Sequence, residues 1–178
     1  MSRIALTYRD YAALPDDGRR YQILDGELFV TAAPATRHQM ISIRLSALLH
    51  AHVTAHGLGL VLAAPVDVIL ADTSIVQPDI VFVGDDRQHL VSARGIEGAP
   101  TLGVEILSPT TTMVDRGRKR ELYARYGMPF YWIADDEARA LEMRRLRGGA
   151  YELIASPTGP IMLAAEPFPH LALTDIWP

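Results

Sequence analysis

The chain has 178 residues and suits a single domain spanning residues 1–178, long enough to bury a substantial core. Apolar residues make up 49% and charged residues 21%, which is typical of a globular protein and excludes a disordered one. The absence of cysteine excludes disulfides, zinc–thiolate sites and cysteine nucleophiles. A net charge of −4 argues against a protein that coats DNA with its whole surface, although it allows a local basic face.

Turn, cap and spacing signals predict three elements in the first third of the chain. A threonine followed three residues later by an aspartate has the spacing of a helix capping box. An Asp-Gly pair supplies the positive φ angles of a two-residue hairpin turn, and apolar residues at helical spacing before a glycine predict a long helix. The predicted elements are a helix from Thr7, its N-cap, to Leu14 with Asp10 completing the box, a hairpin of strands 21–24 and 27–32 that turns at Asp25-Gly26, and a helix from His38 to His56 that ends at Gly57.

The remaining elements are mainly strands, predicted from short apolar runs bounded by turn residues. A helix separates two of these strands, so the connection has the form of a crossover and the two strands are expected to be parallel. The predicted elements are strands 60–63, 66–70, 80–83 and 102–107, a helix from Asp115 to Tyr126, a strand 130–134 parallel to strand 102–107, and a hairpin of strands 140–146 and 151–154. The expected fold class is α/β (mixed α+β), a mixed sheet flanked by helices with additional β-hairpins.

The N-terminal segment lacks the apolar stretch of a signal peptide, and no apolar run approaches the length of a membrane span. These two observations predict a cytoplasmic protein without a membrane partner.

Two carboxylates suggest a metal site. Asp79 follows a proline at the start of an apolar strand, where a side chain can face a cleft, although a strand-start cap is an equal alternative. Glu105 interrupts the strand 102–107, and a buried carboxylate is costly unless it is paired or bound to a metal. These acids and the backbone carbonyl of Ile106 would supply the oxygen ligands that Mg²⁺ or Mn²⁺ prefers. The alternative for Glu105 is a buried salt bridge, to an arginine or to Lys119.

Lys119 is the only lysine of the chain, against sixteen arginines. In a helix that starts at Asp115 it shares a face with Leu122 and Tyr126, and this face is expected to pack on the sheet that carries Glu105. An ammonium group there could orient an attacking water and stabilise charge that builds on a phosphate. An ordinary pair with Asp115, worth only about 0.3–0.5 kcal/mol, is compatible with that role.

Six short motifs occur in one order along the chain and are more specific together than singly. They are residues 21–28 (YQILDGEL), 34–38, 77–80 (QPDI), 104–110 (VEILSPT), 115–127 and 130–135 (FYWIAD). The series closely resembles the Uma-two family of restriction-endonuclease-like proteins, a branch of the PD-(D/E)XK nuclease superfamily, over nearly the whole chain. The resemblance implies a restriction-endonuclease-like core, a divalent metal ion and hydrolysis of phosphodiester bonds in DNA.

Carried over by position, Asp79 and Glu105 would be the paired catalytic acids and metal ligands, and Lys119 would be the catalytic lysine. In the superfamily this lysine usually lies two residues after the strand acid, where this chain has Leu107, so Lys119 would act from the following helix. The family usually has a glutamate in the first strand where this chain has Gln22. Gln22 offers a carbonyl oxygen without a charge, which predicts weaker metal binding or a weakened enzyme.

Four further residues are candidates for accessory roles. His38 could face the site from the start of the long helix, although an exposed or internally bonded histidine is the favoured alternative. Ser108, in a hydroxyl-rich loop, could contact phosphate. Arg116 and Arg120 could do the same, with a solvated helix face as an equal alternative. No base-reading element such as a helix–turn–helix is apparent, so the sequence does not disclose a recognition site.

These observations predict a DNA endonuclease that uses Mg²⁺ or Mn²⁺ and acts as a homodimer, because one site per subunit needs two-fold pairing to cut both strands. The alternative is a nuclease-fold module with an impaired site that binds DNA or protein. Gln22 and the negative net charge favour this alternative, whereas the retained Asp79, Glu105 and Lys119 oppose it. A third possibility is a dimeric interaction protein whose ionic cluster is purely structural.

Overall fold

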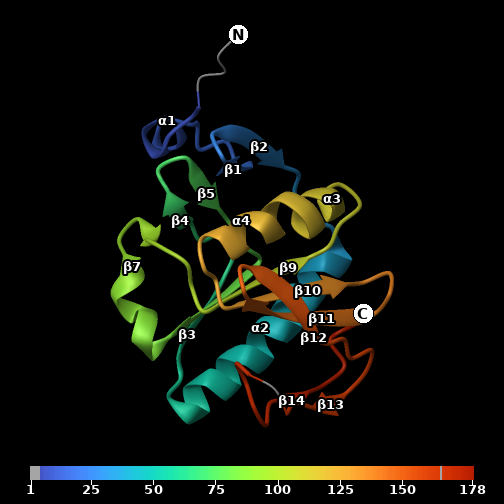
Figure 1. The fold of residues 1–178 in the computed structure, drawn as a ribbon. Coiled ribbons are helices and arrows are strands. Elements are labelled where there is room, and N and C mark those ends of the chain that lie inside the picture. Colours follow the sequence, from blue (N-terminus) through green and yellow to red (C-terminus); the bar gives the residue numbers. More distant parts are fainter. Residues whose placement is uncertain (1–4, 165) are drawn as a thin grey trace.

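The computed structural model describes residues 5–164 and 166–178, which form an α+β fold with two six-stranded sheets and one two-stranded sheet (Figure 1). In chain order the elements are α1 (Tyr8–Ala12), β1 (Arg20–Leu24), β2 (Glu27–Thr31), α2 (Thr36–His56), β3 (Gly59–Ala63), β4 (Val68–Ala71), β5 (Ser74–Val76), β6 (Ile80–Gly84), the 3₁₀-helix η1 (Asp85–Leu90), β7 (Val91–Ser92), β8 (Gly95–Ile96), β9 (Leu102–Ile106), α3 (Thr112–Val114), the π-helix η2 (Asp115–Lys119), α4 (Arg120–Arg125), β10 (Phe130–Asp135), β11 (Ala140–Arg147), β12 (Ala150–Ala155), β13 (Ile161–Met162) and β14 (Ala172–Leu173).

The local signals of the first third of the chain are confirmed. The Thr7 backbone N–H donates to Asp10 Oδ2 at 2.8 Å, which closes the capping box of α1. The β1–β2 turn has positive φ angles of 50° at Asp25 and 80° at Gly26. The long helix ends at a left-handed Gly57, as its sequence predicts.

The central sheet has the order β12-β11-β10-β9-β6-β3. Its strands β9 and β10 are parallel, in a register that pairs Glu105 with Ile133, and the other neighbours are antiparallel. The predicted crossover and the mixed sheet are therefore both confirmed. The second six-stranded sheet has shorter strands and is called the smaller sheet below. Its order is β2-β1-β5-β4-β8-β7, and the first hairpin lies at its edge.

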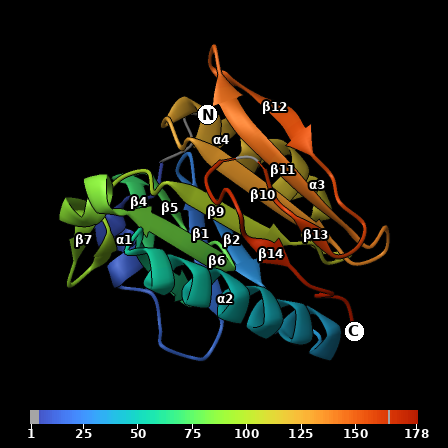
Figure 2. The same cartoon turned by 90° about the horizontal axis from the view of Figure 1, so that it is seen from below.

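The central sheet is covered on both faces (Figures 1 and 2). On one face, α2 buries a stripe of apolar side chains together with residues of the C-terminal segment. On the other face, α4 and the smaller sheet enclose a second core. The α2 stripe consists of Ile41, Leu45, Leu49 and Val53. This layering places the sheet residues between two bodies of apolar side chains, so a charged group on β9 needs a partner.

Several short elements were not predicted. The strands β5, β7, β8, β13 and β14 and the helix η1 span at most six residues each, too few for periodicity to reveal. The predicted strand 66–70 begins at Val68, and the predicted helix from Asp115 begins instead at Thr112 and passes through the π-helical turn η2. The missing signal-peptide pattern concerns in part residues 1–4, which lie outside the described residues. Within the described residues, no helix is both long and apolar enough to cross a membrane.

Candidate active site

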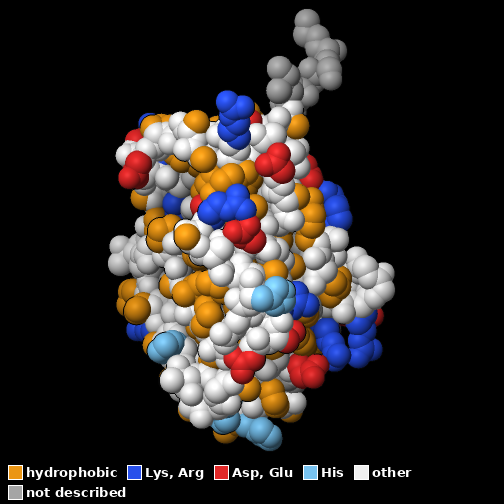
Figure 3. All heavy atoms as spheres, turned by 90° about the vertical axis from the view of Figure 1, so that its left-hand side faces the viewer, with side chains coloured by type: hydrophobic (Ala, Val, Ile, Leu, Met, Phe, Trp, Pro, Cys, Tyr) orange, Lys and Arg blue, Asp and Glu red, His pale blue; other side chains and the backbone are white. Residues whose placement is uncertain are grey.

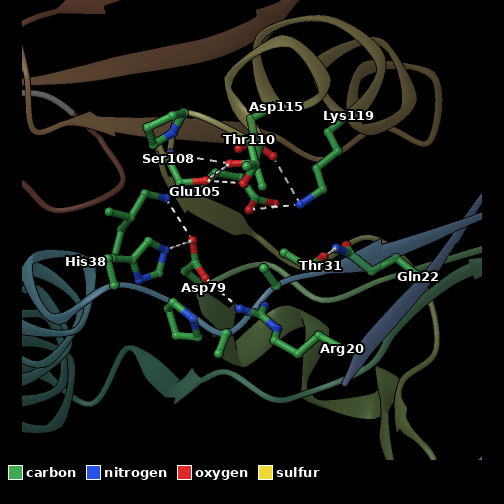
Figure 4. A pocket seen from close by; sticks show the side chains of 17 residues that line it. Arg20, Gln22, Thr31, His38, Asp79, Glu105, Ser108, Thr110, Asp115 and Lys119 are labelled. Atoms are coloured by element: carbon green, nitrogen blue, oxygen red, sulfur yellow. Dashed lines mark hydrogen bonds and ion pairs between the residues drawn. The ribbon is translucent and has the colours of Figure 1, made fainter. Parts of the chain in front are cut away.

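The three residues predicted to be catalytic come from different segments and line one cavity of about 210 Å³ (Figure 4). Asp79 immediately precedes β6, Glu105 lies in β9, and Lys119 ends η2. The antiparallel pairing of Ile80 with Val104 brings the two acidic positions to neighbouring strands. The full lining is Arg20, Gln22, Thr31, Ala32, Ala33, Pro34, Ala35, His38, Asp79, Glu105, Ile106, Ser108, Pro109, Thr110, Thr111, Asp115 and Lys119.

Asp79 is held as a carboxylate by three donors. Arg20 Nη1 donates to Asp79 Oδ1 at 3.1 Å, and the Ile106 backbone N–H donates to Oδ2 at 2.8 Å. His38 Nε2 lies 3.1 Å from the same Oδ2. Burial alone would raise the pKa of Asp79, but the contacts with His38, Ile106 and Arg20 hold this pKa below its ordinary value. Asp79 is therefore a charged carboxylate on the cavity wall.

Glu105 and Lys119 form a buried ion pair that includes Asp115. Lys119 Nζ lies 3.0 Å from Glu105 Oε2 and 3.2 Å from Asp115 Oδ1. The Tyr123 hydroxyl donates to the other oxygen of Glu105 at 2.6 Å. The salt bridge to Lys119 considered for Glu105 is thus present, and the lysine points inward, as the helical pattern predicts (Figure 4).

Burial dominates the protonation of this cluster. It raises the pKa of Glu105 to about 8, helped by the nearby charges of Asp115 and Asp79 and opposed by Lys119. Burial would lower the pKa of Lys119, but Glu105 and Asp115 outweigh it and raise that pKa. The lysine therefore remains charged, and Glu105 keeps its proton to a higher pH than an exposed glutamate does.

The accessory candidates divide into two groups. Gln22, His38, Ile106 and Ser108 line the cavity, whereas Arg116 and Arg120 do not. Arg116 instead pairs with Asp135 and Glu142, each at 2.7 Å, so its guanidinium group is directed to the neighbouring strands β10 and β11. The Gln22 carbonyl oxygen accepts the Gln77 backbone N–H at 2.9 Å.

The sequence reasoning missed three site residues. Arg20 opens β1, and its Nη2 also donates to the Gln77 carbonyl at 2.7 Å. Asp115 was interpreted only as an ordinary pairing partner of Lys119, yet it is 2% exposed and lines the cavity. Tyr123 is fully buried, and its spacing of four residues from Lys119 was the available signal.

The donor set fits a hard divalent cation held partly by water. Among the described residues, no three histidine, aspartate or glutamate side chains form a ready ligand cluster. Asp79 and Glu105 nevertheless present carboxylate oxygens to one cavity, and each carboxylate has about four acceptor positions, of which the observed contacts use only some. Mg²⁺ usually keeps several waters and takes one or two carboxylates, so two acids suffice.

The charge distribution gives no broad basic surface on the face shown in Figure 3. Lysine and arginine side chains are interspersed there with aspartate and glutamate among the coloured residues. Several arginines are paired within the molecule, including Arg37 with Asp136 at 2.7 Å and Arg118 with Glu27 at 2.6 Å. Any contact with phosphate on this face would therefore be local.

Comparisons with known proteins agree with this architecture. A crystal structure of a putative nuclease belonging to DUF820 from Anabaena variabilis ATCC 29413 superposes with a TM-score of 0.76, over 96% of this chain and 97% of that chain, at 17% identity. The uncharacterized protein slr1290 of Synechocystis sp. (strain ATCC 27184 / PCC 6803 / Kazusa) is 29% identical over 105 residues, 59% of this chain, and the match spans about half (54%) of that relative's length. The model of the Uma2 family, described as "Putative restriction endonuclease", matches residues 8–175, and the chain therefore belongs to the Uma2 (Uma-two) family.

Proposed function

We propose that this protein is a metal-dependent endonuclease that hydrolyses phosphodiester bonds in DNA. The observation that carries the proposal is the convergence of Asp79, Glu105 and Lys119 on one cavity from three separate segments. Two acids and an amine around a common space have the chemistry needed to bind a cation and to act on a phosphate. Membership of the Uma2 family supports the same reaction class.

Each site residue has a distinct task in this proposal. Asp79 and Glu105, with the Ile106 carbonyl, would hold Mg²⁺ or Mn²⁺, which when bound polarises a phosphoryl oxygen and lowers the pKa of a bound water. Lys119 would orient the attacking water and stabilise the charge that builds on the phosphate. Arg20 and His38 would keep Asp79 charged and fixed, because both contact its carboxylate.

The substrate contacts are also part of the proposal. Ser108 lies at the cavity and could donate to a phosphate oxygen. Arg116 and Arg120 lie outside the cavity and could reach phosphate only at its margin. A homodimer would place one site on each strand of a duplex, because a two-fold axis relates both subunits and strands.

The test is nicking of plasmid DNA in the presence of Mg²⁺ or Mn²⁺. We expect Glu105→Gln and Lys119→Met to lower the rate by at least about 100-fold, the usual effect of removing one catalytic group. The matched controls are Glu152→Gln and Arg125→Met, which neutralise exposed charges that do not line the cavity and should retain activity. Absence of nicking by the wild type with either metal, or full activity in both site variants, would refute the proposal.

A second candidate function is a DNA- or protein-binding module with an impaired site. Two observations favour it. The side-chain oxygen of Gln22 already accepts a hydrogen bond from the Gln77 backbone, and Asp79 and Glu105 already form ion pairs within the protein. This module would bind plasmid DNA in a gel-shift assay without nicking it. Calorimetric titration with Mn²⁺ then separates a module that retains a metal site from one whose cluster is structural.

A further inference from the structure

A second cavity of about 210 Å³ lies beside the candidate active site. It is formed by the β1–β2 hairpin on one side and by the loop and helical turn that lead to Lys119 on the other. Gln22, Asp115 and Lys119 line both cavities. A ligand group in the second cavity would therefore lie next to a group held by the two acids.

The walls of this second cavity differ in character from those of the active site. Leu24, Phe29 and Val114 supply apolar side chains. The Phe29 ring is covered by the guanidinium group of Arg118, which lies 4.8 Å from the ring centroid and is itself paired with Glu27 at 2.6 Å. The aromatic wall is thus held in place before any ligand arrives.

The polar wall offers hydrogen bonds as well. Gln22 Nε2 donates to Thr31 Oγ1 at 3.2 Å, while the Gln22 oxygen accepts the Gln77 backbone N–H at 2.9 Å. A glutamine amide carries two N–H donors, and within the described residues only one of them has a partner. The second N–H of Gln22 and the hydroxyl group of Thr31 are therefore placed to meet the polar edge of a flat ring.

We propose that the second cavity binds one unstacked nucleobase, that of the nucleotide adjoining the phosphate at the active site. This inference rests on the proposed nuclease function and names the substrate class: DNA strands whose bases can leave the stack, such as single-stranded, frayed or mismatched DNA. A heteroaromatic base combines apolar faces with a polar edge. This matches a cavity in which Phe29, Gln22 and Thr31 share one face of the hairpin and Val114 lines the helical side. The size is suitable, because a dry cavity of about 150 Å³ already accepts benzene.

The test compares two strands that differ only in their bases. Fluorescence anisotropy measures binding of a labelled oligothymidylate and of an abasic oligonucleotide of the same length, with EDTA present so that metal-dependent hydrolysis cannot consume either strand. Both strands have the same phosphates, so the affinity ratio isolates the contribution of the bases. We expect the wild type to prefer the base-bearing strand by about tenfold, the effect of one stacked base.

Two positions, one lining the cavity and one outside it, provide matched variants. Val114 lines the cavity from the helical side, whereas Leu28 lies on the exposed face of β2, opposite to Phe29, and does not line it. Val114→Trp should fill the cavity and reduce the preference to about twofold or less, whereas Leu28→Trp should retain it. Phe29→Leu, which removes the stacking ring, provides a second variant if Val114→Trp unfolds.

The outcomes separate the two proposals. Nicking of plasmid together with equal binding of the base-bearing and abasic strands would overturn the nucleobase site and leave the nuclease intact. A tenfold preference that Val114→Trp abolishes, without nicking by the wild type, would support the nucleobase site and refute hydrolysis. Loss of the preference in Leu28→Trp as well, or no binding of either strand even with Mg²⁺, would also overturn the inference.

Discussion

Replacing Lys119 with Met removes a buried positive charge and keeps a side chain of similar length. The Lys119 ammonium pairs with Glu105 at 3.0 Å and with Asp115 at 3.2 Å, and the three side chains are only 2–5% exposed. Removing one partner of a buried ion pair typically destabilises a protein by about 3–5 kcal/mol. Because burial raises the pKa of Glu105 to about 8, protonation of Glu105 limits this loss. We expect the free energy of unfolding to fall by about 3 kcal/mol at pH 7.

The same variant should become relatively worse at higher pH. When folding raises the pKa of a carboxyl group, the protein becomes less stable as the pH rises from the pKa of the unfolded state, 4.5 for Glu105, to the pKa of the folded state. Above the folded-state pKa this group causes no further loss of stability. In the wild type this loss therefore ends near pH 8. Without the opposing charge of Lys119 the pKa of Glu105 rises further, so the loss continues above pH 8 by at most about 1.4 kcal/mol per pH unit.

Urea unfolding at pH 7 and pH 9 measures both effects, with the fluorescence of the buried Trp132 and Trp177 as the signal. Arg125→Met serves as the control, because it breaks an exposed pair with Asp25 and should change stability by less than about 1 kcal/mol. If Lys119→Met loses less than about 1 kcal/mol at both pH values, the ammonium does not neutralise buried acids. The ion-pair cluster of Glu105, Asp115 and Lys119 would then not exist in the folded protein in solution.

Three further changes have outcomes that follow from the structure. Mn²⁺ affinity, measured by calorimetry, should increase up to about tenfold per pH unit between pH 6 and pH 8, because the proton on Glu105 competes with the cation; a flat profile would exclude Glu105 as a ligand. Tyr123→Phe removes the 2.6 Å hydrogen bond to Glu105 and should lower the free energy of unfolding by about 1–3 kcal/mol in urea titrations, and an unchanged value would show that the bond contributes nothing. Gly59→Ala places a Cβ 2.1 Å from the Val83 carbonyl oxygen and should destabilise by several kcal/mol in thermal unfolding, against about 1–2 kcal/mol for Gly57→Ala, where no atom lies within 4 Å; equal effects would contradict this.

The fold was predictable where the signal is local or where connectivity restricts topology. The turn at Asp25-Gly26 determines the first hairpin, and a helix between strands 102–107 and 130–134 favours their parallel pairing, which the structure confirms. The division into two sheets was not predictable, because β5 and β8 are short and find their partners across the sequence. Such pairings depend on the packing of the whole domain.

The principal residues of the candidate site were predictable, because a charged residue inside an apolar strand or on the apolar face of a helix is expected to be buried. Glu105 within an apolar strand and a single inward lysine both indicate a cluster, and the structure brings them within 3.0 Å. Arg20 escaped notice because an arginine at the start of a strand has the pattern of an exposed residue. The π-helical turn at Asp115–Lys119 also escaped notice, since no residue type encodes the wider hydrogen-bond spacing, which is frequent at functional sites.

The solitary lysine makes this molecule convenient for spectroscopy. Isotope-labelled lysine would enter the chain at one position only, and its side-chain nitrogen lies beside Glu105. Any magnetic resonance signal from that nitrogen reports directly on titration, ion binding or substrate arrival, without assignment of a crowded spectrum.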